Sequence, residues 1–268
     1  TATPTATPAP PTATPTNTPV PPTATPTFTP TTPPTGVELS SLNTRAGASN
    51  LWLPLALANF DQPDAGLWEF RTREATHTSS AVMCWAACDR LANAAQRLGL
   101  GDRALHWRAR ADEMRAAIES QAWNAELGRY AATFGGKEMD ASLLQMVDTR
   151  FLAADDPRFL ATLNYLETQL RRGDVVLRYA DKDDFGLPET AFNFCTFWLI
   201  EALYLVGRRE EARTLFDRML GRRTRAGLLS EDCDLATGAP WGNYPQTYSL
   251  AGLINCAVLL SNPWSSVR

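Results

Sequence analysis

Residues 1–36 repeat Thr-Ala-Thr-Pro units, and this repeat limits the fold of the chain more than any other feature. The segment contains 15 threonines and 12 of the 19 prolines in the 268-residue chain. It contains no charged residue and no cysteine. Proline fixes the backbone φ angle and lacks an N–H donor, so the segment can form neither a helix nor a sheet ladder. We predict a disordered, extended Thr/Pro-rich linker over residues 1–36, which leaves the rest of the chain for a folded domain.

The linker composition also bears on location. Spacers of this kind are typical of exported proteins, so we predict an extracellular or cell-surface location, although we expect no signal peptide within this chain. An unselected disordered tail is the alternative interpretation of the same residues. For residues 37–59 we predict a connecting extended segment, because Pro54 interrupts the apolar run between Asn50 and Asn59.

Charge and cysteine usage exclude several classes of protein. The 25 basic and 29 acidic side chains give a net charge of −4 without a basic cluster, which argues against a nucleic-acid groove. No apolar run approaches the ~20 residues that span a bilayer, so we expect no membrane span. With two histidines and five dispersed cysteines without CxxC spacing, we expect no metal site, no disulfide framework and no cofactor.

After residue 60 the sequence indicates helices joined by loops that contain glycine. Gly99, Gly173 and Gly207 are expected to end helices, and Pro157 occupies a favourable first helical position after Asp156. Residues 129–134 are the one expected hairpin arm. The predicted helices cover 79–98, 102–121, 141–147, 156–171, 190–206, 209–220 and 246–260.

The second of these helices, over 102–121, is expected to be capped by Asp102 and to bury one stripe of side chains. That stripe comprises Leu105, Ala109, Met114 and Ile118. Helices that alternate with long loops, without a fixed internal period, indicate an array of helical hairpins. Such an array forms either an open solenoid or part of an α/α toroid.

Three separated sequence blocks carry a resemblance to a known family. The blocks comprise residues 63–71 with 77–85, residues 177–184 with 191–198, and residues 227–238 with 242–249. In this order they resemble the general-acid region, the substrate-clamping loop and the general-base loop of the glucoamylase-type and trehalase-like glycoside hydrolases, family fifteen. The resemblance covers residues 60–262 and leaves 263–268 as a tail. It implies an all-α, (α/α)6-toroid-type domain that is an incomplete barrel, because the family's early helices are absent.

Inverting hydrolysis needs one carboxylic acid and one carboxylate, about 6.5–9.5 Å apart on opposite sides of the bond. Glu69 lies among Leu67, Trp68 and Phe70, and burial there would favour the neutral form that a general acid needs. Glu231 lies in a polar, glycine-flanked loop that suits an ionised general base. The resemblance implies the same two roles. The alternatives are a carboxylate stabilised by a helix dipole for Glu69 and a solvated loop acid for Glu231.

Further candidates would bind the sugar. Arg178 and Asp181 can engage vicinal hydroxyls, although a surface ion pair is the alternative. Arg71 follows the acid, and Trp68, Trp241 and Tyr248 could offer rings on which a pyranose stacks. The remaining candidates have structural interpretations: core packing for Phe192, a helix-cap neighbour for His77, and buried thiols for Cys195 and Cys233.

The predicted function is exo-acting, inverting hydrolysis of α-glucosidic bonds, of the glucoamylase, α-glucosidase or trehalase type. The expected substrate is an α-glucan oligosaccharide or trehalose, and the expected partner is a missing N-terminal half-barrel. The resemblance implies that an Arg-Asp pair and an aromatic residue from the early helices would complete the innermost sugar subsite. Without them, the alternatives are a catalytically incomplete half-barrel serving as a carbohydrate-binding or surface module, and an α-solenoid interaction domain.

Overall fold

The computed structural model describes residues 57–183 and 186–261. The predicted Thr/Pro-rich linker, nearly all of the connecting segment and the tail lie outside these residues. The described end of the connecting segment, residues 57–59, is a helical turn rather than extended chain. Within the described ranges, no helix combines the length and the apolar character needed to cross a membrane.

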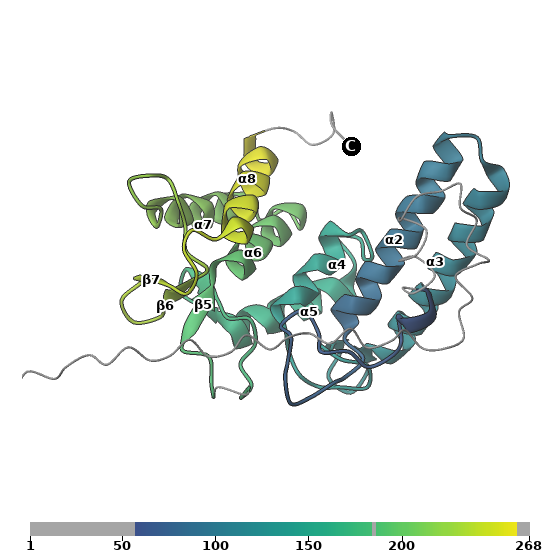
Figure 1. Ribbon diagram of the computed structural model, residues 1–268, viewed down its shortest axis with the longest axis horizontal. Helices are drawn as coiled ribbons and strands as arrows, with labels where there is room; N and C mark the ends of the chain where they lie inside the picture. The colour runs from purple at the N-terminus through teal and green to yellow at the C-terminus, as the bar shows by residue number, and fades with distance from the viewer. Residues whose placement is uncertain (1–56, 184–185, 262–268) are drawn as a thin grey trace, which may run out of the picture. The chain divides into compact units, whose positions relative to one another are not determined.

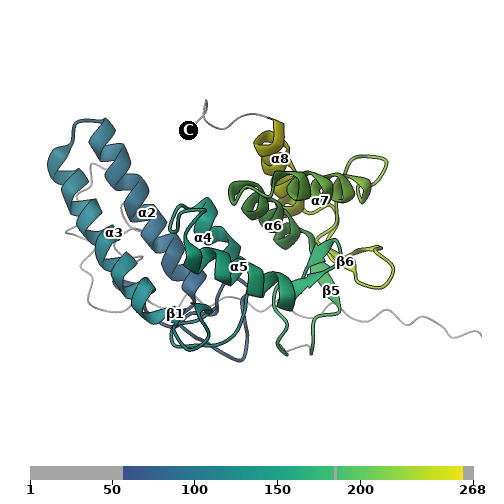
Figure 2. The same cartoon turned by 180° about the vertical axis from the view of Figure 1, so that it is seen from behind.

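The first two long helices form an antiparallel hairpin, α2 (Thr78–Arg97) and α3 (Gly101–Gln121), which lie side by side in both views (Figures 1 and 2). The backbone φ angle of +71° at Gly99 permits the reversal between them, as the sequence predicts.

The expected details of α3 are wrong in two respects. Leu100 is its N-cap, and Asp102 lies in the first turn without a capping bond. Leu105 is 72 % exposed, and Ala109 is exposed as well. Met114 and Ile118 are buried as expected, whereas Ala104 and Ala111 complete the buried stripe in place of Leu105 and Ala109.

The middle of the domain consists of short elements and one longer helix. The 3₁₀ helix η2 (Ala141–Leu144) continues into α4 (Gln145–Asp148), and α5 (Pro157–Leu170) follows. Asp156 caps α5 by accepting the N–H of Arg158 at 2.8 Å. After α5 the chain forms a hairpin, β3 (Arg171–Arg172) and β4 (Val175–Val176), so Gly173 belongs to a strand turn and does not end the helix. A second small hairpin pairs β1 (Trp123–Asn124) with β2 (Arg129–Tyr130).

Helix α6 (Asn193–Leu205) lies at the centre of the C-terminal part, against α4, α7 (Arg209–Gly221) and α8 (Thr247–Ser261) (Figures 1 and 2). Most of its residues are apolar and buried, as in a helix that is covered by neighbours on most sides, and Glu201 is its one charged residue and is half-buried. Helix α8 has no charged residue, but Ile254 on it is 59 % exposed and Val258 is 43 % exposed. One face of α8 is therefore uncovered by the described residues.

A three-stranded antiparallel sheet lies at the start of α6. It pairs β5 (Thr190–Phe192) with β6 (Asp232–Asp234), and β6 with β7 (Pro240–Trp241). The expected helix over 190–206 is therefore wrong for its first three residues. Their strand conformation depends on β6, which lies some forty residues later in the chain and which local sequence does not show.

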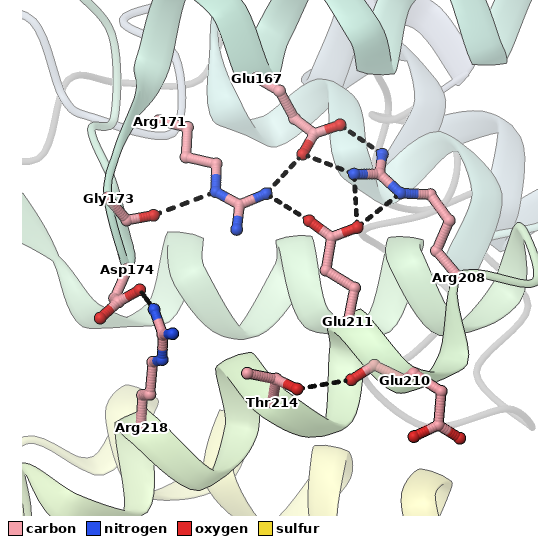
Figure 3. A network of polar contacts seen from close by, with 9 residues as sticks. All are labelled: Glu167, Arg171, Gly173, Asp174, Arg208, Glu210, Glu211, Thr214 and Arg218. Atoms are coloured by element: carbon pink, nitrogen blue, oxygen red, sulfur yellow. Dashed lines mark hydrogen bonds and ion pairs between the residues drawn. The ribbon is translucent and has the colours of Figure 1, made fainter.

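An ion-pair network joins α5 to α7 (Figure 3). Arg171 donates to Glu167 and to Glu211, each at 2.7 Å, and Arg208 also contacts both carboxylates. Burial works to raise the pKa of Glu211, but the hydrogen bonds from the two arginines outweigh it and hold the pKa below its ordinary value. The network thus links α5 to α7, which are separated in the chain by α6, and it lies outside the cleft described below.

Candidate active site

A cleft of about 420 Å³ brings together both predicted catalytic carboxylates, Glu69 and Glu231. They come from loops that precede the first and the last long helices of the domain, α2 and α8. Arg178 lies in the same cleft. The remaining lining residues are mostly aromatic or apolar: Leu67, Trp68, Phe192, Phe194, Trp198 and Tyr248.

The loop that carries Glu69 is a tight turn. Its N–H donates to the carbonyl of Gly66 at 3.1 Å, and Gly66 has a φ angle of +70°. A Cβ on Gly66 would lie 2.7 Å from Nε2 of His77, so this position needs a glycine. Glu69 itself has a φ angle of +54°, which is uncommon for a residue with a side chain.

The expectation that Glu69 is buried against its neighbours is wrong. Glu69 is exposed, and Leu67 is 52 % exposed, although both line the cleft. Only Trp68 in this turn points inward. Its ring contacts the rings of Tyr179, Phe192 and Trp198 at centroid distances of 6.3, 5.8 and 6.1 Å.

A buried carboxylate beneath the cleft, Asp140, holds the indole of Trp68. Nε1 of Trp68 donates to Oδ2 of Asp140 at 2.6 Å, and the N–H of Ser142 donates to Oδ1 at 2.7 Å. Asp140 is 6 % exposed, and burial raises its pKa although both hydrogen bonds act in the opposite direction. The sequence showed Asp140 only as a residue before a short helix, so its link to Trp68 could not be predicted.

Glu231 is held by the loop that leads to α8. The backbone N–H and the side-chain amide of Asn243 each donate to Oε2 of Glu231 at 3.0 Å. Gly242 packs so closely that a Cβ there would lie 2.8 Å from the same oxygen. The neighbouring Asp232 is buried and accepts the hydroxyl hydrogen of Thr190. Burial raises the pKa of Asp232, while the bond from Thr190 and the charge of Arg178 lower it.

The guanidinium of Arg178 lies near aromatic rings. Within the described part of the chain it forms no ion pair and no hydrogen bond. Its guanidinium carbon lies 5.8 Å from the centre of the Trp68 ring and 5.5 Å from that of Tyr179. Its Nε is buried without a hydrogen-bond partner among the described residues. A buried donor without a hydrogen-bond partner destabilises the folded state. Arg178 is therefore suited to bind an acceptor that enters the cleft.

The other predicted sugar contacts are divided between the cleft and places outside it. Tyr248 lies in the cleft and stacks on Phe194 at a centroid distance of 5.8 Å. Arg71 lies in an adjoining cavity of about 90 Å³ that it shares with Arg178. Asp181 lines a separate cavity of about 170 Å³. Trp241 is 60 % exposed on β7 and does not line the cleft.

Four residues were expected to serve packing or helix capping rather than sugar binding, and they lie largely as expected. Phe192 packs in the core, at 8 % exposure, and also forms part of the cleft wall. His77 is the N-cap residue of α2 without a side-chain capping bond. Cys195 and Cys233 are buried free thiols whose pKa values burial raises.

Three residues that line the cleft were not predicted from the sequence as binding-site residues: Leu67, Phe194 and Trp198. All three lie inside the sequence blocks described above, and each is four residues or fewer from a residue that was singled out. Among the described residues, no group of three or more histidine, cysteine, aspartate or glutamate side chains could hold a metal ion. Two carboxylates, an arginine and aromatic walls form an arrangement that can bind a sugar and transfer protons to and from it.

Comparison with solved structures identifies the fold. A glycosidase structure superposes with a TM-score of 0.66 at 20 % identity, covering 76 % of this chain and 57 % of the glycosidase. The glucoamylase of Saccharomycopsis fibuligera gives a TM-score of 0.60 at 12 % identity, covering 78 % of this chain and 59 % of that enzyme. The predicted all-α, (α/α)6-toroid-type fold is confirmed, and the partial coverage fits an incomplete barrel.

Sequence comparison identifies the family. A trehalase of Mycobacterium tuberculosis is 38 % identical over 218 residues, which are 78 % of this chain and 32 % of the trehalase. The chain thus matches about a third of the length of this relative. The sequence profile described as glycosyl hydrolases family 15 matches residues 56–258. The chain therefore belongs to the glycosyl hydrolases of family 15.

Proposed function

We propose that this chain supplies both catalytic carboxylates of a glycoside hydrolase that cleaves α-glucosidic bonds with inversion. Glu69 acts as the general acid and Glu231 as the general base. The observation that supports this assignment most is that both side chains line one cleft, although they come from opposite ends of the domain. Inversion needs two carboxylates that face each other across a sugar and a water molecule.

The surroundings of each carboxylate support its role. Asn243 occupies one oxygen of Glu231, so the other oxygen is free to take a proton from water. Glu69 lines the cleft and is exposed, so a leaving group that it protonates can depart into solvent. Arg178 and the ring of Tyr248 bind the sugar in this scheme, through hydroxyl groups and through the pyranose face.

Trehalose is the favoured substrate, because the similar curated proteins are named trehalase. Maltooligosaccharides and longer α-glucans form the second substrate class, since the fold is also that of glucoamylases. We place the domain outside the cell or at the cell surface, because the Thr/Pro-rich segment has the composition of spacers in exported proteins.

A catalytically incomplete carbohydrate-binding module is the second candidate function. It is favoured by the exposure of Glu69. Both candidates leave the uncovered face of α8 for a further helical half-barrel, which would cover Ile254 and Val258.

The purified chain should be incubated with maltose, trehalose and soluble starch, while released glucose and its anomeric form are measured. Maltose and starch should first release β-glucose, and trehalose should release α- and β-glucose in equal amounts. Release of only α-glucose from trehalose would show retention and contradict the assignment. Glu231→Gln serves as the control for a contaminating enzyme. Sugar binding without turnover would favour the binding module.

A further inference from the structure

Asp140 does not line the cleft, yet it contacts the residue that precedes Glu69. One of its oxygens accepts the indole N–H of Trp68 at 2.6 Å, and the other accepts the N–H of Ser142 at 2.7 Å. The side chain is buried, so neither bond competes with bulk water. Hydrogen bonds to a buried carboxylate are short and strong, and they fix the orientation of the donor.

The backbone of Asp140 also joins the segment that carries Arg178. Asp140 forms an antiparallel bridge with Tyr179, and the N–H of Ala141 donates to the carbonyl of Arg178 at 2.9 Å. One residue therefore holds the Trp68 turn and the Arg178 segment next to each other. The cleft needs both, since Glu69 and Arg178 line it together.

The backbone conformation of Glu69 depends on contacts such as the hydrogen bond between Trp68 and Asp140. A φ angle of +54° is unfavourable for a residue with a side chain, and such conformations persist where surrounding contacts impose them. The turn itself is closed by a bond of 3.1 Å from the N–H of Glu69 to Gly66. Because Glu69 is exposed, the position of its carboxyl group depends on the turn that carries it, and the ring of Trp68 anchors that turn through Asp140.

We propose that Asp140 is a positioning residue for the general acid, which acts by holding the indole of Trp68. The catalytic part of this proposal rests on the function proposed above. A residue that orients the acid should matter most for substrates whose leaving group must be protonated. It should matter little where the leaving group departs without a proton.

Two variants break the same hydrogen bond from opposite sides. Asp140→Asn keeps the shape but offers one acceptor oxygen to two donors, so either Trp68 or Ser142 loses its partner. Trp68→Phe removes the donor and keeps an aromatic ring. Asp156→Asn is the matched control, because Asp156 also caps a helix, with a bond of 2.8 Å to Arg158, but its hydrogen bonds go to Arg158 and not to Trp68.

The first measurement needs no turnover. Hydrogen exchange of the tryptophan indole N–H groups is followed by NMR, and Trp68→Phe identifies the resonance of Trp68. In Asp140→Asn this proton should exchange about tenfold faster, as the loss of one strong hydrogen bond implies. It should be unchanged in Asp156→Asn. An unchanged rate in Asp140→Asn would overturn the proposal.

The second measurement compares kcat on trehalose with kcat on α-glucosyl fluoride, whose leaving group needs little protonation. Asp140→Asn should lose about tenfold or more on trehalose and clearly less on the fluoride. Equal losses on both substrates would show a general effect on the fold and contradict the proposal. If Asp140→Asn does not fold, Trp68→Phe is compared in the same way. Absence of turnover in the unaltered chain would overturn the proposed function, and the exchange result alone would then decide whether Asp140 anchors the turn of Glu69.

Discussion

Asn243 donates both its backbone N–H and its side-chain amide to the same oxygen of Glu231, each across 3.0 Å. The carbonyl of Asn243 in turn accepts the N–H of Glu231 at 2.9 Å. Oε1 of Glu231 has no hydrogen-bond partner within the part of the chain that the structure describes. The carboxylate is thus fixed through one oxygen and free at the other, as a base that binds water needs to be.

Asn243→Ala should lower kcat on α-glucosides by about tenfold and change KM much less, since a lost hydrogen bond to a charged group costs roughly 1.5–3 kcal/mol. Steady-state kinetics on maltose and trehalose measure the two constants separately. Asn93→Ala is a suitable control. Asn93 lies at an exposed position on α2 and also donates to a carboxylate, that of Asp89. An unchanged kcat would show that Asn243 does not orient the base.

Glu231→Gln and Glu69→Gln should both abolish turnover of trehalose, but they should differ with a good leaving group. An amide cannot take a proton from water, so Glu231→Gln should stay inactive on α-glucosyl fluoride. Glu69→Gln should recover part of its activity, because that leaving group needs little protonation. Comparable recovery in both variants would mean that the two roles are wrongly assigned.

Gly242→Ala should reduce activity far more than Gly227→Ala. Both glycines have positive φ angles, +74° and +79°, so each alanine adds backbone strain of about 1 kcal/mol. Only at Gly242 would the new Cβ collide with Glu231, at 2.8 Å from Oε2, whereas nothing lies within 4 Å at Gly227. Thermal unfolding and kcat measured on both variants separate strain from displacement of the base. Equal kcat values would contradict the collision.

Glu211→Gln should destabilise the domain by about 1 kcal/mol at pH 7, because the ion pairs of the network in Figure 3 are partly exposed and screened by water. The pKa of Glu211 lies below its ordinary 4.5 in the folded state. Its stabilising effect is therefore present above about that pH and is lost as the pH falls through the lowered folded-state pKa.

Urea unfolding of both proteins at pH 7 and at pH 3 tests this dependence. The difference between the unaltered chain and Glu211→Gln should shrink at pH 3. Glu113→Gln is the matched control, since Glu113 pairs with Arg110 on exposed α3 and belongs to no network. A difference that is the same at both pH values would show that the charge of Glu211 does not contribute.

Local signals in the sequence predicted most of the helices. Gly99 and Gly207 follow helix ends and have positive φ angles, and Pro157 begins α5 as its position indicates. Gly173 shows the limit of such signals, because a glycine that follows a helix can equally serve a strand turn. The strand at Thr190 could not be predicted, because it depends on pairing with distant residues.

Those site residues could be predicted that are identified by their residue type and by their place in the three sequence blocks. Glu69, Glu231 and Arg178 were singled out and meet in one cleft. Asp181 was also singled out but lines another cavity, together with Tyr179 and Asp140. The exposure of Glu69 depends on what covers the turn, and no local pattern contains that information.

The two carboxylates of the cleft belong to the turn before α2 and the loop before α8, so the pair exists only while both ends of the domain are folded. Fraying of either end separates the pair without unfolding α6 at the centre. Under the proposed function, heat should therefore inactivate the protein at or below the temperature at which its helices melt. Sugar turnover would then report loss of the native domain earlier than helix content does.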